Sequence, residues 1–270
     1  MSVDAGPARG PQAMYDLATA RRPHWAREAT LVVSLYFVYE VIRAQVGVSA
    51  LGAQRHGFDV LRWERDLHIN FEHWINTTLT PLSVIAVPAC FFYASAYLIA
   101  TISILVWTYR KHPAEYRQMR TLLGVITALA LIGFWLFPAA PPRLLPHAGF
   151  VDTLDHYRSV GWWGSADSLP SGAKSIGNQF AAMPSLHVGW SLWCAWTVRR
   201  NATRRWVRVA IWGYPTATTL VVLLTANHYV LDVVAGAALW AVVTIGSAIA
   251  RRNRQQADAA APITGIWPRS

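Results

Sequence analysis

The stretch AMPSLH (182–187) combines a proline, a hydroxyl and an imidazole at the start of an apolar segment. Pro184 suits the first turn of a helix, where its missing N–H group is not needed. The backbone N–H groups from Ser185 to His187 would then point out of the helix end, with the positive end of the helix dipole behind them. Together with the Ser185 hydroxyl, such an end favours a phosphate site. The simpler interpretation is a helix start with a buried histidine.

Two further stretches offer a nucleophile and a cation. In NHYVLD (227–232), His228 and Asp232 are four positions apart and share one face of a helix. The carboxylate can hold the Nδ1–H of the imidazole and leave Nε2 able to attack. FPAAPPR (137–143) ends in Arg143, whose forked guanidinium suits a phosphoryl group. Taken singly, such a pair is most often a local hydrogen bond, and such an arginine most often an interfacial anchor.

The same residues leave a metal site open as another interpretation. His187, His228 and Asp232 could ligate a metal, although the motifs offer no further Cys, His or carboxylate ligand. We expect no metal and no cofactor, because the imidazoles, the arginine and the helix dipoles already supply a nucleophile and a positive field.

Apolar helices are the elements that would bring these motifs together. Of the 270 residues, 54% are hydrophobic and only 14% are charged, whereas soluble domains carry about a quarter charged residues. Long apolar stretches between short basic clusters predict an all-α, polytopic membrane helix bundle. The six transmembrane helices are expected at 29–47, 81–108, 121–138, 183–198, 207–226 and 228–250.

The other segments are arranged around this membrane domain. We expect a disordered cytoplasmic tail at 1–28, the six-span catalytic domain at 29–250 and a second cytoplasmic tail at 251–270. Residues 48–80 predict amphipathic helices that lie on the outer face of the membrane. Their apolar stripe consists of Val60, Trp63, Leu67, Phe71 and Trp74. The long outer loop 139–182 is expected to act as a lid or to bind the acceptor.

Basic residues alternate along the chain in the way that orients a membrane protein. Lys and Arg number four in 109–120 and five in 199–208, but only three in each of the longer segments 48–80 and 139–182. The positive-inside rule therefore predicts that both termini are cytoplasmic and that the three motifs face outside. The net charge of +10 then reflects orientation and contact with anionic lipids, not a nucleic-acid partner. The Ala- and Arg-rich composition is compatible with a bacterial plasma membrane.

The order PSLH then HYVLD in a chain with six expected spans resembles the type 2 phosphatidic acid phosphatase superfamily, over most of the chain. The resemblance implies that His228 is the nucleophile and forms a phosphohistidine. It also implies that Asp232 orients His228 and that His187 protonates the leaving alcohol. The groups implied to hold the phosphoryl oxygens are Arg143, Ser185 and the backbone around Gly189.

The chain departs from the lipid phosphatases of that superfamily where they carry cations. Leu136 stands at the position of a lysine, and Val221 and Val222 stand at the positions of a Ser-Arg pair. The pattern is more similar to the branch that contains inositol phosphorylceramide synthase, an inositol phosphotransferase. We expect Arg43, near the outer end of the first span, to supply part of the missing positive charge, with Glu40 as its partner on the same helical face. Otherwise Arg43 extends to the lipid head groups.

The residues and the resemblance predict a membrane-embedded, metal-independent phosphotransferase that acts on lipid phosphoesters. It would move a phosphoryl or phospho-alcohol group, through a phosphohistidine, from a phospholipid or polyprenyl phosphate to a polyol acceptor such as inositol. One alternative is a lipid phosphate phosphatase that hydrolyses phosphatidic acid or a polyprenyl (pyro)phosphate. The other is a non-enzymatic transporter or scaffold in which the histidines form a proton path.

Overall fold

The computed structural model describes residues 23–44, 49–164, 180 and 182–260. The regular elements in these ranges are helices, which confirms the predicted all-α fold class. The main helices are α2 (Trp25–Ala44), α5 (Ser83–Lys111), α6 (Pro113–Leu136), α8 (Leu186–Asn201), α10 (Gly213–Leu224) and α11 (Val230–Ala260). The shorter ones are α3 (Ala50–Asp66), α4 (Glu72–Leu79), α7 (Thr153–His156), α9 (Arg205–Ala210), and the 3-10 turns η1 (Pro142–Leu144) and η2 (Trp162–Gly164).

Four helical segments in the described part of the chain are long and apolar enough to cross a membrane. They are Ser83–Lys111, Pro113–Leu136, Arg205–Leu224 and Val230–Ala257, and each matches one of the predicted spans. The other two expected spans, 29–47 and 183–198, fall on α2 and α8. The sequence of α2 includes four charged residues, and α8 has only 16 residues, whereas a bilayer needs about 20 apolar ones. The six-span arrangement therefore remains a prediction.

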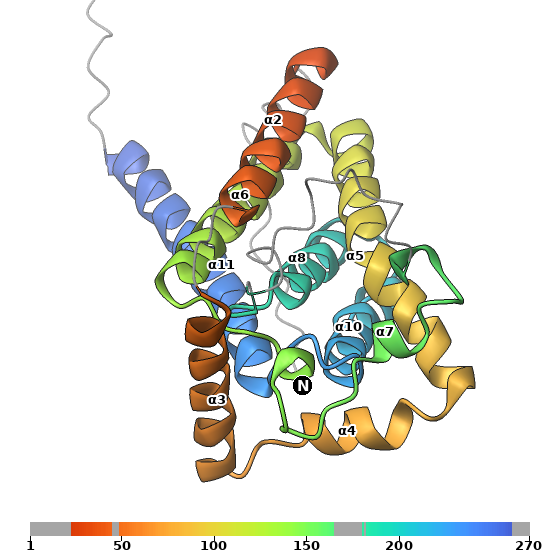
Figure 1. Ribbon diagram of the computed structural model, residues 1–270. Helices are drawn as coiled ribbons and strands as arrows, with labels where there is room; N and C mark the ends of the chain where they lie inside the picture. Colours follow the sequence, from red (N-terminus) through yellow and green to blue (C-terminus); the bar gives the residue numbers. More distant parts are fainter. Residues whose placement is uncertain (1–22, 45–48, 165–179, 181, 261–270) are drawn as a thin grey trace, which may run out of the picture.

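The central element of the bundle is α8, with α5, α6, α10 and α11 packed around it (Figure 1). Its tryptophans join it to α6 by hydrogen bonds: Trp193 Nε1 donates to the carbonyl of Met119 (2.9 Å), and Trp190 Nε1 donates to Thr127 Oγ1 (3.0 Å). Protein surrounds most of α8, so this helix can be buried in the bundle although it is shorter than a helix that spans the bilayer by itself.

Two helices extend past the boundaries expected from the sequence. The helix α2 begins at Trp25, inside the segment 1–28 expected to be a tail, and α11 continues to Ala260, beyond the expected end at 250. Residues 1–22 and 261–270, which hold most of both expected tails, lie outside the described residues.

The helices α3 and α4 lie at the end of the bundle where α6 ends and α11 begins (Figure 1). Ala140, just after α6, donates its N–H to the carbonyl of Ala53 in α3 (2.9 Å). Gly57 allows this contact, because a Cβ there would lie 2.7 Å from both the carbonyl oxygen of Ala140 and the hydroxyl of Tyr229. The residues of α3 that are buried are Ala53, Gly57, Val60, Leu61 and Glu64.

The buried face of α3 is not the apolar stripe identified in the sequence. Of that stripe, Val60 is fully buried, and Trp63 stacks on Phe137 while staying partly exposed. The other four side chains are 45–66% exposed: Trp63, Leu67, Phe71 and Trp74. In a protein that contacts lipid, large apolar side chains can face outward, so these exposures are compatible with helices on the membrane surface, which stay a prediction.

Candidate active site

The three sequence motifs meet at one end of the bundle. Ser185 donates its N–H to the carbonyl of Asp232 (3.0 Å), which joins the start of α8 to the start of α11. Arg143 donates its N–H to the carbonyl of Ala226 (3.0 Å), which joins the segment after α6 to the end of α10. The imidazole rings of His187 and His228 lie 5.6 Å apart between centroids, at 65° to each other.

The hydrogen bonds of His228 define its tautomer. Its Nδ1 lies 3.0 Å from the carbonyl oxygen of Ala182 and 3.2 Å from Asp232 Oδ2. Both partners are acceptors, so Nδ1 carries the proton and Nε2 carries the lone pair. His228 is 4% exposed and Asp232 is fully buried. The arrangement therefore presents an oriented imidazole with a nucleophilic Nε2.

Asp232 also shapes the start of α11. Its Oδ2 accepts the N–H of Tyr229 at 3.0 Å. Tyr229 precedes the first residue of α11, and Asp232 is the third residue of the helix, so the contact is half of a capping box. One carboxylate thus holds both the imidazole of His228 and the backbone turn that carries it.

His187 lies in the first turn of α8, against two tyrosines of α5. Its ring stacks on Tyr93 (4.7 Å, 22°) and meets Tyr97 edge-on (4.6 Å, 62°). These aromatic contacts restrict the ring's orientation, so α5 positions the group that the sequence suggested as a proton donor.

The start of α8 differs in detail from the sequence-based expectation. The helix begins at Leu186, and Ser185 is its N-cap, with Oγ accepting the N–H of Val188 at 3.4 Å. Pro184 therefore precedes the cap and is not in the first turn. The Ser185 N–H is not available to a phosphate, because it is bonded to Asp232. In the first turn of α8, the N–H of Leu186 is a group without an intrahelical acceptor, and it is the one that we expect to face an anion.

Gly189 lies where α8 packs closely against α6 and α11. Its N–H is bonded to the carbonyl of Ser185 at 3.1 Å within α8. A Cβ at this position would lie 3.5 Å from Ile126 and 3.6 Å from the carbonyl oxygen of Gly236. The Gly189 N–H is thus engaged within α8, and the expectation that the backbone around Gly189 holds phosphoryl oxygens stays a prediction.

Arg143 is held in place by residues of two other segments. Its Nε donates to Asn227 Oδ1 (2.9 Å), and its Nη1 donates to Asp152 Oδ2 (2.6 Å) in an ion pair. Asn227 directly precedes His228, so the guanidinium lies beside the turn that carries His228. Asp152 also caps α7 by accepting the N–H of Asp155 (3.1 Å), which ties the segment 139–164 to the site.

Two positions at which similar lipid phosphatases carry cations hold apolar residues in this chain, Leu136 and Val222. Val222 is 1% exposed within an apolar cluster that includes Ile75 and Val188. Leu136 ends α6 and is 67% exposed. Arg43, the suggested substitute, falls near the end of α2, where its side chain lies outside the described residues, as does that of Glu40.

Several polar residues at this end of the bundle were missed in the sequence. Glu64 and Glu72 are fully buried. Asn76 is also buried, and its side chain donates to the carbonyls of Leu224 (2.7 Å) and Val151 (3.0 Å) and accepts the N–H of Val151 (2.8 Å). In the sequence each of these residues directly follows a large apolar one (Trp63, Phe71 or Ile75), and this was the only signal for them.

The described residues also bear on the metal interpretation. Within them, no group of three or more His, Cys, Asp or Glu side chains is arranged to hold a metal ion. The constellation that they do form is two imidazoles, one carboxylate and one guanidinium.

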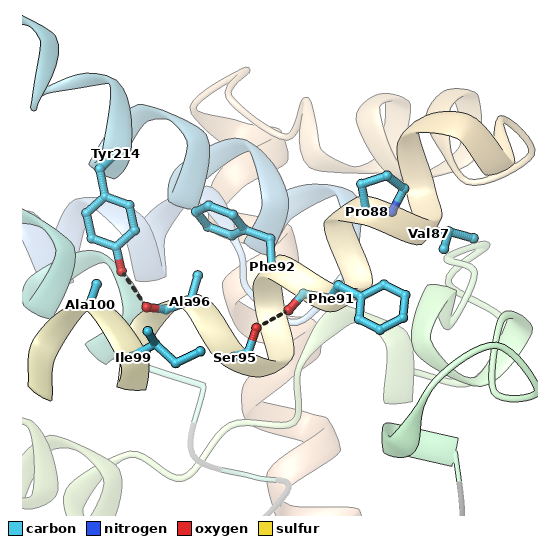
Figure 2. Close-up of a pocket in the computed structure, with 9 residues that line it drawn as sticks. All are labelled: Val87, Pro88, Phe91, Phe92, Ser95, Ala96, Ile99, Ala100 and Tyr214. Carbon is cyan, nitrogen blue, oxygen red and sulfur yellow. Dashed lines mark hydrogen bonds between the residues drawn. The ribbon is translucent and has the colours of Figure 1, made fainter. Parts of the chain in front are cut away.

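Two apolar grooves flank the bundle. One has a volume of about 370 Å³ and includes Met183 and Pro184, which directly precede the cap of α8. Its other walls come from α6, α11 and Trp63. The second groove, of about 790 Å³, runs along α5 beside Tyr214 and contains none of the predicted site residues (Figure 2).

A comparison with protein-family models agrees with this geometry. The model described as the PAP2 superfamily matches residues 58–246, which include all three motifs. No curated protein and no solved structure matches the chain.

Proposed function

The chain belongs to the PAP2 superfamily, and from that premise we propose that it is a membrane enzyme that transfers a phosphoryl or phospho-alcohol group from a lipid phosphoester through a phosphohistidine on His228. The superfamily suggests phosphoester phosphatase or phosphotransferase activity on a phosphorylated lipid. The observation that carries the proposal is the hydrogen-bond pattern of His228. Two acceptors at Nδ1 leave Nε2 as the nucleophilic atom.

The proposed reaction has two displacements at phosphorus. In the first, His228 Nε2 bonds to phosphorus, the bond from phosphorus to the leaving oxygen breaks, and His187 gives that oxygen a proton. In the second, an acceptor hydroxyl attacks phosphorus, its proton goes to His187, and the phosphorus–nitrogen bond breaks to return neutral His228. Arg143 and the positive end of the α8 helix dipole would stabilise charge on the other phosphoryl oxygens.

The charge at the site favours a phosphodiester donor over a phosphomonoester. Arg143 is already paired with Asp152, and Asp232 adds a buried negative charge. A diester carries one negative charge, whereas a monoester carries up to two near neutral pH. Because Val222 and Leu136 bring no cation, a singly charged donor fits better. This supports transfer to an alcohol, such as inositol, over hydrolysis of phosphatidic acid.

The site's surroundings fit a lipid substrate at a membrane face. The groove beside Met183 and Pro184 offers an apolar path from the bundle surface to the cap of α8. We propose that the site faces outside and that both termini are cytoplasmic, in a bacterial plasma membrane. Basic residues at the opposite end support this orientation: Arg200 at the end of α8 pairs with Glu115 at the start of α6 (3.1 Å).

The proposal is tested with purified protein in lipid vesicles. Radiophosphate-labelled phosphatidylinositol and phosphatidic acid are supplied separately, with and without added inositol, and labelled products are separated. We expect label on the protein after an alkaline quench and label on the acceptor alcohol at longer times. His228→Ala should abolish both, whereas His147→Ala, which changes an exposed histidine after η1, should retain them.

The same assay separates the alternatives. Phosphate released from phosphatidic acid without an acceptor would favour the phosphatase. Activity lost in EDTA and restored by a divalent metal would favour the metal site. Full function in a correctly inserted His228→Ala variant would favour the transporter or scaffold and reject the enzyme.

A further inference from the structure

Two glutamates are buried between α3, α4 and the start of α11. Glu64 lies near the end of α3 and Glu72 begins α4, and both are 0% exposed. The short turn between the helices brings them together, and their carboxyl groups interact with each other. Neither residue belongs to the three motifs, and the reaction proposed above assigns them no role.

Glu64 completes the start of α11. Its Oε1 accepts the N–H of Leu231 at 2.7 Å. Leu231 is the second residue of α11, and an N-cap side chain normally accepts from the second or third residue of a helix. Tyr229 occupies the N-cap position, but its hydroxyl donates to the carbonyl of Ala140 (2.7 Å). A carboxyl group from α3 thus performs the capping that the residue before α11 does not provide.

The remaining oxygens of the pair constrain its charge. Among the described residues, no hydrogen-bond donor reaches Glu64 Oε2 or either carboxyl oxygen of Glu72. Two ionised carboxylates can only accept, so they would repel each other in a buried site at large energetic cost. A proton on one of them changes this, because the acid then donates to its neighbour.

The electrostatics around the pair agree with a retained proton. Burial, and then repulsion from Glu72, raises the pKa of Glu64 to about 9, and burial also raises the pKa of Glu72. Asp232 in α11 adds repulsion, His73 in α4 acts in the opposite direction on Glu72, and Tyr229 is the remaining titratable neighbour, with its own pKa raised by burial.

We propose that Glu64 and Glu72 share one proton and act as a positioning pair that holds the first turn of α11, and with it His228 and Asp232, in the active geometry. The pair then carries one negative charge: one carboxyl group caps Leu231, and the other is its hydrogen-bond partner. If both carboxyl groups were ionised, a second negative charge would lie close to a site that must bind an anion. The link to activity rests on the proposed function, whereas the shared proton does not.

Glutamine variants test the shared proton. In Glu72→Gln, the amide N–H replaces the shared proton and the charge of the pair is unchanged. We expect activity within about twofold of wild type, as for the control Asp66→Asn on the exposed face of α3. The double variant Glu64→Gln/Glu72→Gln removes the negative charge, so protonation of His228 becomes less favourable. The acid limb of its pH–activity profile should shift to lower pH, a change that a purely structural role would not cause.

Thermal unfolding in detergent tests the same point without any activity. The unfolded state releases this proton at an ordinary glutamate pKa, near 4.5, whereas the folded pair retains it until about pH 9. The folded state therefore binds more protons in this window, and stability falls as pH rises through it. For one proton we expect the wild-type Tm to fall by roughly 3–5 °C per pH unit relative to Glu72→Gln, which has no shared proton to lose.

The outcomes distinguish the pair from the enzyme proposal. The predicted difference in Tm slope supports the shared proton even if no phosphoryl transfer is found. Equal slopes in wild type and Glu72→Gln would overturn it. So would a Glu72→Gln variant as damaged as Glu72→Ala, or a double variant with the same pH profile as the single ones.

Discussion

At Gly236, a single added methyl group should reduce catalysis much more than it reduces stability. It lies in α11 directly against the cap of α8: a Cβ there would be 2.3 Å from the carbonyl oxygen of Ser185 and 3.4 Å from its nitrogen. Ordinary contact begins near 3.4 Å, so Gly236→Ala must separate the two backbones by about 1 Å. The hydrogen bond from Ser185 to Asp232 (3.0 Å) lies within this contact.

The expected effect of Gly236→Ala on stability is smaller than its expected effect on the catalytic rate. Overpacking costs about 1–3 kcal/mol, and the replacement of glycine by alanine inside a helix returns about 0.5–1 kcal/mol. The net loss of about 0–2.5 kcal/mol lowers Tm by at most several degrees in a domain of this size. A displacement of about 1 Å between catalytic groups, however, reduces a rate by about 100-fold. His187 and Asp232 lie on opposite sides of this contact, so we expect kcat to fall far more than stability.

The assay compares Gly236→Ala with Gly246→Ala on the same helix, where no atom lies within 4 Å of the added Cβ. Phosphoryl transfer and thermal unfolding are measured on both proteins in detergent. The control should retain wild-type kcat with equal or slightly higher Tm. Equal kcat in the two variants, or a loss confined to KM, would show that the contact between α8 and α11 does not set the catalytic geometry.

Two further predictions concern the segment after α6. Asp152→Asn keeps the cap of α7 but removes the charge paired with Arg143, so inorganic phosphate should inhibit the variant about fivefold more strongly than wild type. Asp155→Asn serves as the control. Weaker inhibition of Asp152→Asn would instead show that Asp152 orients the arginine. Asn76→Ala leaves several buried backbone groups unbonded and should cost about 3 kcal/mol, seen as a lower Tm and faster proteolysis of residues 139–164. Thr78→Ala, exposed on the same helix, should change neither; a similar loss in both variants would show that the Asn76 network contributes little.

The site could be predicted from the sequence where its contacts are local. His228 and Asp232 are one helical turn apart, so their pairing follows from helix geometry. Ser185 caps the helix that begins one residue later, a local contact that was nevertheless not predicted, because Pro184 was expected in the first turn. The partners that come from distant segments could not be predicted: the carbonyl of Ala182 at His228, and the side chains of Asp152 and Asn227 at Arg143. No periodicity encodes such contacts.

The fold was predictable in class but less so at the edge of the bundle. The sequence predicted helices on the membrane surface with Trp63 and Trp74 at the head-group level, and these tryptophans are exposed; the burial of Glu64 and Glu72 was not predicted. A soluble protein buries its apolar face, whereas a protein in contact with lipid can expose it and enclose polar groups inside. The period of a pattern therefore identified the helices, but it did not identify which face packs on the protein.

The carboxyl groups at the start of α11 also change how the site can bind an anion. Sequence reasoning assigned phosphate binding to two helix N-termini, but Asp232 holds the N–H of Tyr229 and Glu64 holds that of Leu231. The start of α11 is thus neutralised from within the protein, and its dipole supports the carboxylates that orient His228. In the proposed mechanism, Arg143 and the start of α8 would therefore bind the phosphoryl oxygens. The start of α11 would hold His228, the proposed nucleophile, among carboxyl groups. Because Arg143 and the start of α8 supply little positive charge, a donor with one negative charge should react faster than a monoester dianion with the same lipid chains. The difference in rate should narrow below about pH 6, where the monoester becomes a monoanion.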